Sequence, residues 1–527
     1  MSGLPADGSE FGGSGVTGVV SRAVDVRAVR AWLADMILPG ATDTPASVSK
    51  QVQAEWVDLL GELEAVKNTV TATQARLAVA LDEATRAEEA RQSIRAERRG
   101  RGVPNQVGAA LQSSPHAGAG FLGTARAWIT GMPHTFDAMR TGVLAQWRAT
   151  LLVRETSHLT PEDRARIDEE ICGPTHRAAL ARTGTRRLVA RIKELAGQLD
   201  VHACVKRNAK AASERSVSVR PAPDLMVYLT ALVPMAQGVQ AYAQLKAHAE
   251  AVKATGDERG AGQIMADSLI ERVTGREPGK ADEVPVTINL LVSDQTLLAD
   301  GDQPAVVVEG APAGVGTVPA PVVRNLVAQG IDAGAAWLRA IYVNPQGRLL
   351  ATTSTSRFHP RGLAGLLRAR EQGICATSWC DAPVRHVDHV VPHVEGGATS
   401  LDNGQGLCAR CNHAKQAPGW RQKVTEIDGR HAVETTTPTG HTHVSVAPEP
   451  PRPVRDTGPV PAWTPAARMN GPAAGRIPRS RYSIGCHTGP DRGPIAYRSS
   501  RPDRSRCPKR RTRHPALRAD LSWGRRS

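Results

Sequence analysis

Four cysteines near residue 400 lie in two close pairs whose spacing is typical of metal ligands. The pairs are Cys375-x4-Cys380 and Cys408-x2-Cys411. Two such pairs about 30 residues apart can meet at one tetrahedral zinc ion. The span is too short to bury a sizeable core, and a closed zinc site can supply roughly 10 kcal/mol or more of folding free energy. Disulfide bonds are the alternative, but no signal-peptide pattern precedes the pairs. We therefore expect a structural zinc ion.

A second group of polar residues lies between and beside these pairs: Asp388, His389, Asn403 and Asn412. Hydrolysis of a phosphodiester needs a base that deprotonates water and a cation that stabilises the developing charge and the leaving oxygen. His389 is suited to be the base, because imidazole titrates near neutral pH. Asn403 could orient this base or brace the hairpin. Asp388 and Asn412 offer oxygen ligands, which favour Mg²⁺ or Mn²⁺. Taken alone, His389 would be an ordinary surface histidine, but these neighbours favour the catalytic interpretation.

The elements that must position these side chains form a strand, a second strand and a short helix. β-Branched residues over 385–391 predict the first strand, and residues 404–407 the second. The helix is predicted over 409–417, where a Pro-Gly pair ends it. Because neighbouring residues on a strand point to opposite faces, Asp388 and His389 can divide the work, one toward the ion and one toward the substrate.

This segment resembles the HNH endonuclease family. The resemblance implies that Asp388 is a metal ligand, His389 the general base and Asn403 the central asparagine of the motif. The last family position, often histidine, directly follows the second cysteine of the closing pair and is Asn412 here. His413, one residue later, is the alternative ligand. The implied activity is metal-dependent cleavage of DNA.

Three further basic side chains border the motif. Lys415 follows on the predicted helix and could contact a phosphate. His386 and His393 flank the Asp-His pair, and we expect both to lie in solvated loops.

In the rest of the chain, the period of the apolar residues predicts most of the secondary structure. The length predicts several domains. Apolar residues recur at three- and four-residue steps, which indicates helices, and some shorter stretches alternate or end in turns, which indicates strands. Helical patterns cover about 51–98, 104–158, 161–199 and 223–274; strands are expected near 284–292 and 305–308 and a hairpin over 337–350. Thr160-Pro161 has the residue types of a helix start.

This helical region also resembles a known family. The phrases GMPHTFDAMRTGVLAQWRATLLVRET, RSVSVRPAPDLMVYLTALVP and RGLAGLLRAREQGIC are similar to the helical domain of unknown function that precedes HNH modules in the 13E12 repeat family. The similarity spans roughly residues 50 to 435 and implies no mechanism for the helical region.

These observations predict the fold class and its boundaries. We expect a mainly α N-terminal region with a few strands, then a small α+β module of the ββα-metal HNH type, then a disordered basic tail. The expected segments are a flexible N-terminal segment over 1–48, the helical domain over 49–350, the nuclease module over 351–436 and the tail over 437–527.

Positive charge is concentrated at the end of the chain. Residues 451–527 contain 18 Lys and Arg and 4 Asp, a net charge of +14 out of +15 for the whole chain. Such a composition does not bury enough apolar surface to fold. It could neutralise phosphates as a DNA tether, or it is an incidental extension. No apolar run is long enough for a membrane helix, so we expect no membrane partner and a cytoplasmic location. The HNH resemblance implies DNA as the partner.

Two classes of function fit the sequence. The first is a metal-dependent HNH endonuclease that hydrolyses DNA, with a structural zinc and a catalytic Mg²⁺ or Mn²⁺. The second is a catalytically inactive zinc-stapled nucleic-acid-binding protein derived from a mobile element. A binding module has no need of Asp388, His389 and Asn403 at their family positions, which favours the enzyme.

Overall fold

The structure is a computed structural model that describes residues 17–36, 48–275, 288–299, 301–309, 316–332 and 356–451. Its contacts divide the chain into two units, Met1–Thr457 and Gly458–Ser527, and all described residues belong to the first. The expected hairpin over 337–350 and the basic residues beyond 451 lie outside the described residues.

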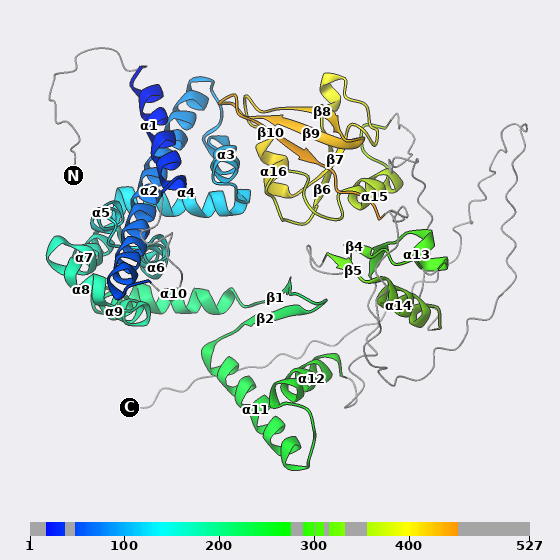
Figure 1. The fold of residues 1–527 in the computed structure, drawn as a ribbon, viewed down its shortest axis with the longest axis horizontal. Coiled ribbons are helices and arrows are strands. Elements are labelled where there is room, and N and C mark those ends of the chain that lie inside the picture. The colour runs from blue at the N-terminus through cyan, green and yellow to red at the C-terminus, as the bar shows by residue number, and fades with distance from the viewer. Residues whose placement is uncertain are drawn as a thin grey trace, which may run out of the picture. The chain divides into compact units, whose positions relative to one another are not determined.

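Two helices come first in the chain, α1 (Thr17–Ala34) and α2 (Lys50–Arg91) (Figure 1). The helix α1, of 18 residues, lies inside the segment 1–48 that the sequence assigns to a flexible N-terminal part. The 42-residue helix α2 begins where the N-cap Ser49 accepts a hydrogen bond from the backbone N–H of Val52, a contact that satisfies one free donor of the first turn. Its buried residues all lie from Asn68 onward.

Eight shorter helices follow α2, and α2 to α9 share the apolar core of the region. They are α3 (Val103–Ala110), α4 (Pro115–Gly131), α5 (Pro133–Arg140), α6 (Gln146–Thr156), α7 (Pro161–Cys172), α8 (Arg177–Arg182), α9 (Thr185–Leu199) and α10 (Val201–Ser213). The largest fully buried side chain is Trp128, whose indole N–H donates to the carbonyl of Ala149 over 3.1 Å. The predicted helix start at Thr160 is confirmed, because its hydroxyl accepts from the N–H of Asp163.

A buried carboxylate fastens two of these helices. Asp168 of α7 is fully buried and accepts hydrogen bonds from the backbone N–H groups of His134 and Thr135, at the start of α5, and from the Thr135 hydroxyl. Burial raises the pKa of Asp168 above its ordinary value, and these hydrogen bonds oppose the shift. The carboxylate therefore caps the N-terminus of α5, where orphan donors need an acceptor.

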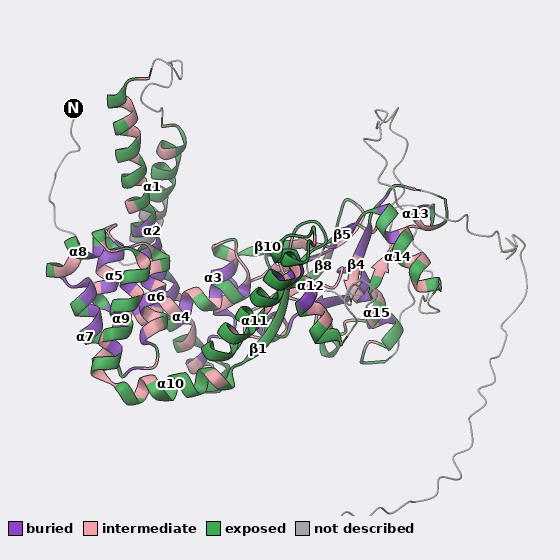
Figure 2. Cartoon of the chain, turned by 90° about the horizontal axis from the view of Figure 1, so that it is seen from below, coloured by how far each residue is buried: buried purple, intermediate pink, exposed green. Residues whose placement is uncertain are grey.

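The helix expected over 223–274 is wrong at its start. Strands β1 (Ser216–Pro221) and β2 (Val227–Leu232) form an antiparallel hairpin, and only then follow α11 (Met235–Ala254) and α12 (Ala261–Thr274). β-Branched and aromatic residues favour the strand, and Pro234 directly precedes α11. Both strands and most of α11 are exposed, and Figure 2 draws β1 and much of α11 in the green of exposed residues.

A small three-stranded sheet follows, which agrees with the strands expected near 284–292 and 305–308. Its elements are β3 (Asn289–Leu291), α13 (Asp294–Leu298), β4 (Ala305–Glu309), β5 (Thr317–Val318) and α14 (Ala320–Asp332). The strand order is β3-β4-β5, and Ala305, Val318 and Val323 form its buried centre.

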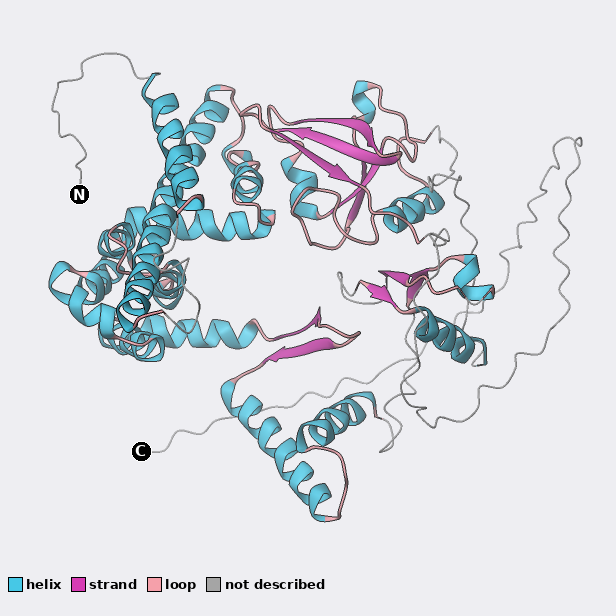
Figure 3. Ribbon diagram, in the orientation of Figure 1, coloured by secondary structure: helices cyan, strands magenta, loops and turns pink. Residues whose placement is uncertain are grey.

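The last described part is an α+β module (Figure 3). It consists of α15 (Arg361–Arg370), β6 (His386–His389), a 3-10 turn at His393–Glu395, β7 (Gly404–Leu407), α16 (Ala409–Ala414), β8 (Arg421–Ile427), β9 (Arg430–Thr436) and β10 (Thr442–Val446). Strands β6 and β7 pair antiparallel, and α16 follows, so the predicted ββα order is confirmed. The mainly helical region followed by a small α+β module is likewise the fold class expected from the sequence.

The boundary expected between module and tail at residue 437 is wrong. Strands β8, β9 and β10 form an antiparallel sheet in the order β10-β9-β8, and β10 lies beyond that boundary. Residues 437–441 contain Pro and Gly and were assigned to the tail. They form the turn of a hairpin, in which the Thr437 N–H donates to the His441 carbonyl. Gln405 of β7 donates to Gln422 of β8 over 2.6 Å and ties the two sheets together.

None of the described helices is both long and apolar enough to cross a lipid bilayer.

Candidate active site and metal centre

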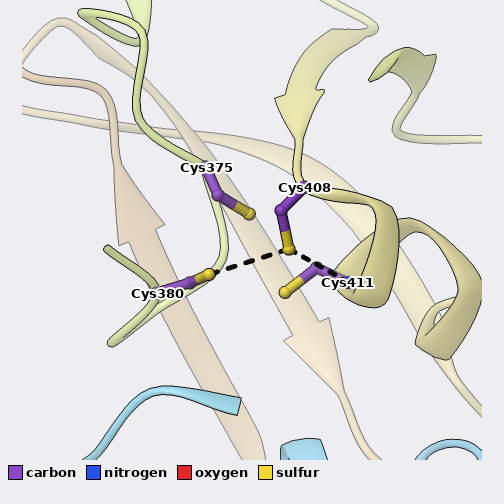
Figure 4. A group of neighbouring side chains, drawn as sticks. All are labelled: Cys375, Cys380, Cys408 and Cys411. Carbon is purple, nitrogen blue, oxygen red and sulfur yellow. Dashed lines mark hydrogen bonds between the residues drawn. The ribbon is translucent and has the colours of Figure 1, made fainter. Parts of the chain in front are cut away.

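The four paired cysteines meet at one point (Figure 4). Their sulfur atoms all lie within 4.8 Å of one another, and all four residues are buried. The Sγ atoms of Cys380 and Cys408 are 3.9 Å apart. A tetrahedral ion with Zn–S bonds of about 2.3 Å requires sulfurs roughly 3.8 Å apart. The four cysteines can therefore hold a metal ion, and their donor set and spacing fit zinc.

Local backbone contacts place these thiols. The N–H of Cys375 donates to the Ala382 carbonyl, and the N–H of Cys380 donates to the Thr377 carbonyl, which closes the first pair into a turn. Cys408 is the N-cap of α16, and its sulfur accepts from the N–H of Cys411. Hydrogen bonds from the neighbouring thiols, Cys375 first, hold the pKa of Cys408 well below its usual range, whereas contacts with the other thiols raise the pKa of Cys380 and of Cys411.

The module also contains a cleft of about 1090 Å³ whose lining includes the Asp-His pair. Asp388 and His389, at the end of β6, both line it. The walls also carry the basic side chains of Arg357, Arg368 and Arg421. A concave surface with this charge suits an anionic backbone such as that of DNA.

His389 is held by contacts from three segments. It is 6 % exposed, and its Nε2 shares a hydrogen bond with the Thr399 hydroxyl at 2.8 Å. The rings of His359 and His393 have their centroids 4.4 Å and 5.8 Å from its own. Burial lowers the pKa of His389 below its ordinary value. This side chain is fixed in place, and the direction of the shift favours the neutral imidazole that a general base needs.

Asp388 is paired with a lysine. The Nζ of Lys415 lies 2.8 Å from Asp388 Oδ2, and the same ammonium donates to the backbone carbonyl of His389. Burial opposes ionisation of Asp388, but the contacts with Lys415 outweigh it, so the pKa of this carboxyl lies below its usual value. Asp388 is therefore an anionic oxygen donor at the wall of the cleft.

Asn403 braces the loop between the two strands. Its Oδ1 accepts from the N–H of Val391, and its Nδ2 donates to the carbonyls of Val391 and Ala398. Of the two roles considered for this residue, the described hydrogen bonds match the brace. The loop that it fixes carries Thr399, the hydrogen-bond partner of His389, so Asn403 also fixes the segment that contacts this imidazole.

The last motif position lies apart from the cleft lining. Asn412 Nδ2 donates to Nδ1 of His386 over 3.0 Å, and neither residue lines the cleft. His386 therefore lies on β6 with a partner, and its expected place in a solvated loop is wrong. Asn412 Oδ1 is buried and has no hydrogen-bond partner among the described residues, so it is a polar atom that could bind a cation. His413 is exposed.

The structure adds two side chains that the sequence did not single out. Thr399 contacts His389 directly, and His359 packs against its ring from the segment before α15. Burial, with the nearby His389, lowers the pKa of His359 to about 4, and its buried Nε2 has no hydrogen-bond partner within the described part of the chain. Neither residue stands at a motif spacing, and His359 lies 30 residues before His389.

Comparison with known proteins agrees with both parts of this description. Residues 376–417 match the family model described as HNH endonuclease. Residues 58–371 match the model described as a domain of unknown function (DUF222). Searches of curated proteins and of solved structures found no match. An HNH domain is therefore present, and it follows a helical domain whose family model covers more than half of the chain.

Proposed function

Because this chain belongs to the DUF222 family and carries an HNH endonuclease domain after that region, we propose that it is a metal-dependent endonuclease that hydrolyses DNA phosphodiester bonds. The observation that carries the proposal is the position of His389. Its imidazole is held by Thr399 in a basic cleft and lies beside the Asp388 carboxylate. General acid–base chemistry on a phosphate needs this combination of a fixed neutral base and cationic walls.

In this mechanism His389 removes the proton from the attacking water. When Nε2–H donates to the Thr399 hydroxyl, the lone pair on Nδ1 is free to accept that proton. Asp388 lies 3.9 Å from Nδ1 and stabilises the imidazolium that forms. Arg357, Arg368 and Arg421 line the same cleft and can hold the DNA phosphates on either side of the scissile bond.

Asp388 and Asn412 are the residues that would hold a catalytic divalent ion, with His413 as the alternative to Asn412. Carboxylate and amide oxygens favour Mg²⁺ or Mn²⁺. When bound, such an ion would stabilise the charge on the phosphate and on the leaving oxygen. In the described structure Lys415 neutralises Asp388, so its ammonium and the ion would compete for this carboxylate.

The structural metal in this proposal is zinc, bound by Cys375, Cys380, Cys408 and Cys411. The four buried thiols leave no open position of the kind that a catalytic zinc needs. This zinc therefore stabilises the fold of the nuclease module and takes no part in the chemistry.

Cleavage of supercoiled plasmid tests the proposed function. The full-length protein should nick or linearise the plasmid with Mg²⁺ or Mn²⁺ and should not do so in EDTA. DNA binding, measured by gel shift in the same buffers, serves as the control for active protein. Binding without cleavage in either metal would support the inactive zinc-stapled nucleic-acid-binding protein instead.

A further inference from the structure

The helical domain reaches the cysteine centre through α3. The side-chain Nδ2 of Asn105 donates to the sulfur of Cys411 over 3.6 Å, across 306 positions of sequence. Asn105 is 5 % exposed, so this amide is removed from water and directed at a metal-binding thiol.

Two neighbouring positions on α3 contact the same module. Thr439, in the turn between β9 and β10, donates to Gln106 Oε1 over 3.0 Å. Gly102, the N-cap of α3, lies against Trp420, so closely that a Cβ on Gly102 would be 2.3 Å from the indole nitrogen. Residues 102, 105 and 106 follow a spacing of three and four, which puts them on one face of the helix.

The other side of α3 is fixed within the helical domain. Gly118 of α4 lies so close that a Cβ there would meet the Pro104 carbonyl at 2.3 Å and the Gly108 nitrogen at 2.6 Å. Such a close crossing needs small residues on both helices. The helical domain therefore sets the position of α3. The opposite face of this helix packs against the nuclease module.

A zinc ion with four thiolates carries a net charge of about −2, which is costly to bury without donors. N–H groups that hydrogen-bond to the thiolates spread this charge, and such outer contacts typically change metal affinity by about 10–100-fold. Within the described part of the chain, the Cys411 N–H reaches the Cys408 sulfur, and the Asn105 amide reaches the Cys411 sulfur.

We propose that the domain of unknown function completes the zinc site of the nuclease module, with Asn105 as a positioning residue whose amide stabilises the Cys411 thiolate. The inference rests on the proposed zinc site. Because binding effects are reciprocal, zinc in turn stabilises the docking of α3. Trp420, which packs on Gly102, also lines the DNA cleft, so the same docking positions one wall of the proposed active site.

The test measures zinc release from the full-length protein to a coloured chelator. Asn105→Leu removes the donor at similar size, and Asn105→Asp replaces it by an anion. We expect release about tenfold faster for the leucine variant and faster still for the aspartate variant. The matched control is Asn68→Leu, which removes another buried amide of the helical domain, one that donates to the Gly142 carbonyl. Its release rate should equal that of the wild type.

Two further measurements keep the proposal testable if the Asn105 variants fold poorly. Gly102→Ala leaves Asn105 in place but pushes against Trp420, and it should also speed zinc release. In the wild type, chelation of zinc should make trypsin cleave faster at Arg99 and Arg101, directly before α3.

The outcomes separate this inference from the proposed zinc site. Wild-type protein that contains no zinc by elemental analysis contradicts the zinc site itself. Zinc-loaded wild type whose release rate matches those of Asn105→Leu and Gly102→Ala, with unchanged trypsin cleavage on chelation, contradicts only the role of the helical domain.

Discussion

The helical core and the nuclease module differ in what holds them together. In the helical region one cluster of 23 buried apolar residues, from Ala72 to Ala196, joins α2 to α9. In the nuclease module the comparable clusters are small: one has five members, four of them cysteines, and another has three. Where apolar burial is this limited, a metal ion and polar contacts must supply the stability.

This difference decides in which parts of the molecule the sequence indicates a function. Metal ligands and catalytic side chains are uncommon residue types at fixed spacing, whereas a helical core accepts many apolar combinations of suitable volume. The nuclease module is therefore recognisable from four cysteines and an Asp-His pair, while the helical core shows a period and a family resemblance that implies no mechanism.

Loss of one zinc ligand should produce the largest effect and would sharpen the comparison. Cys408→Ser should abolish zinc binding and unfold the nuclease module, because a structural zinc contributes roughly 10 kcal/mol or more. The helical core should survive. Elemental analysis and protease mapping measure both effects. The control is Cys204→Ser, at a half-buried cysteine of α10 outside the metal centre; a variant at Cys408 that keeps zinc and resists protease would contradict the account.

A cavity in the helical core should destabilise the helical region and leave the nuclease module unchanged. Leu152 is fully buried, and Leu152→Ala should lower the free energy of unfolding of the helical region by about 2–5 kcal/mol. Zinc content should not change. Urea unfolding followed by circular dichroism gives the value. Leu77→Ala, at a leucine that is 66 % exposed on α2, serves as the control and should shift stability by less than about 0.5 kcal/mol.

How far the sequence predicted the structure also follows this division. The second strand lies over 404–407 as expected. A tetrahedral site leaves little freedom for the backbone that joins its ligand pairs, so the hairpin and the short helix could be predicted from the cysteine spacing and the residues around it. In the helical region strand β2 of the exposed hairpin fell within a stretch predicted as helix, since a short apolar run fits both periods, and β1 lay in none of the predicted elements. The prediction also ended the module too early, at residue 436, because the Pro- and Gly-containing turn that follows resembles a linker in composition.

Contacts between distant segments could not be predicted from one sequence. Thr399, His359 and Asn105 are common residue types at no special spacing, and their partners are set by the packing of the folded chain. The roles proposed for Asp388, Asn403 and Asn412 remain predictions, and the following measurement addresses that of Asn412.

The smallest expected effect concerns the last motif position. Asn412→Ala should raise the Mg²⁺ concentration needed for cleavage by about tenfold, because a neutral oxygen ligand and its buried Oδ1 are lost. His413→Ala, at the exposed neighbour, should leave the requirement unchanged. Metal titrations of plasmid cleavage compare the two. A defect in the His413 variant instead would identify that histidine as the ligand.

The most direct test of the central claim is the cleavage rate of His389→Ala on supercoiled plasmid in Mg²⁺. A general base contributes about 10²–10⁴-fold, so the rate should fall by at least a hundredfold while zinc content and DNA binding are kept. His393→Ala is the matched comparison, because it removes another imidazole from the same cleft, and it should keep most of the activity. Cleavage by His389→Ala at the wild-type rate would contradict the assignment of His389 as the base of an HNH endonuclease.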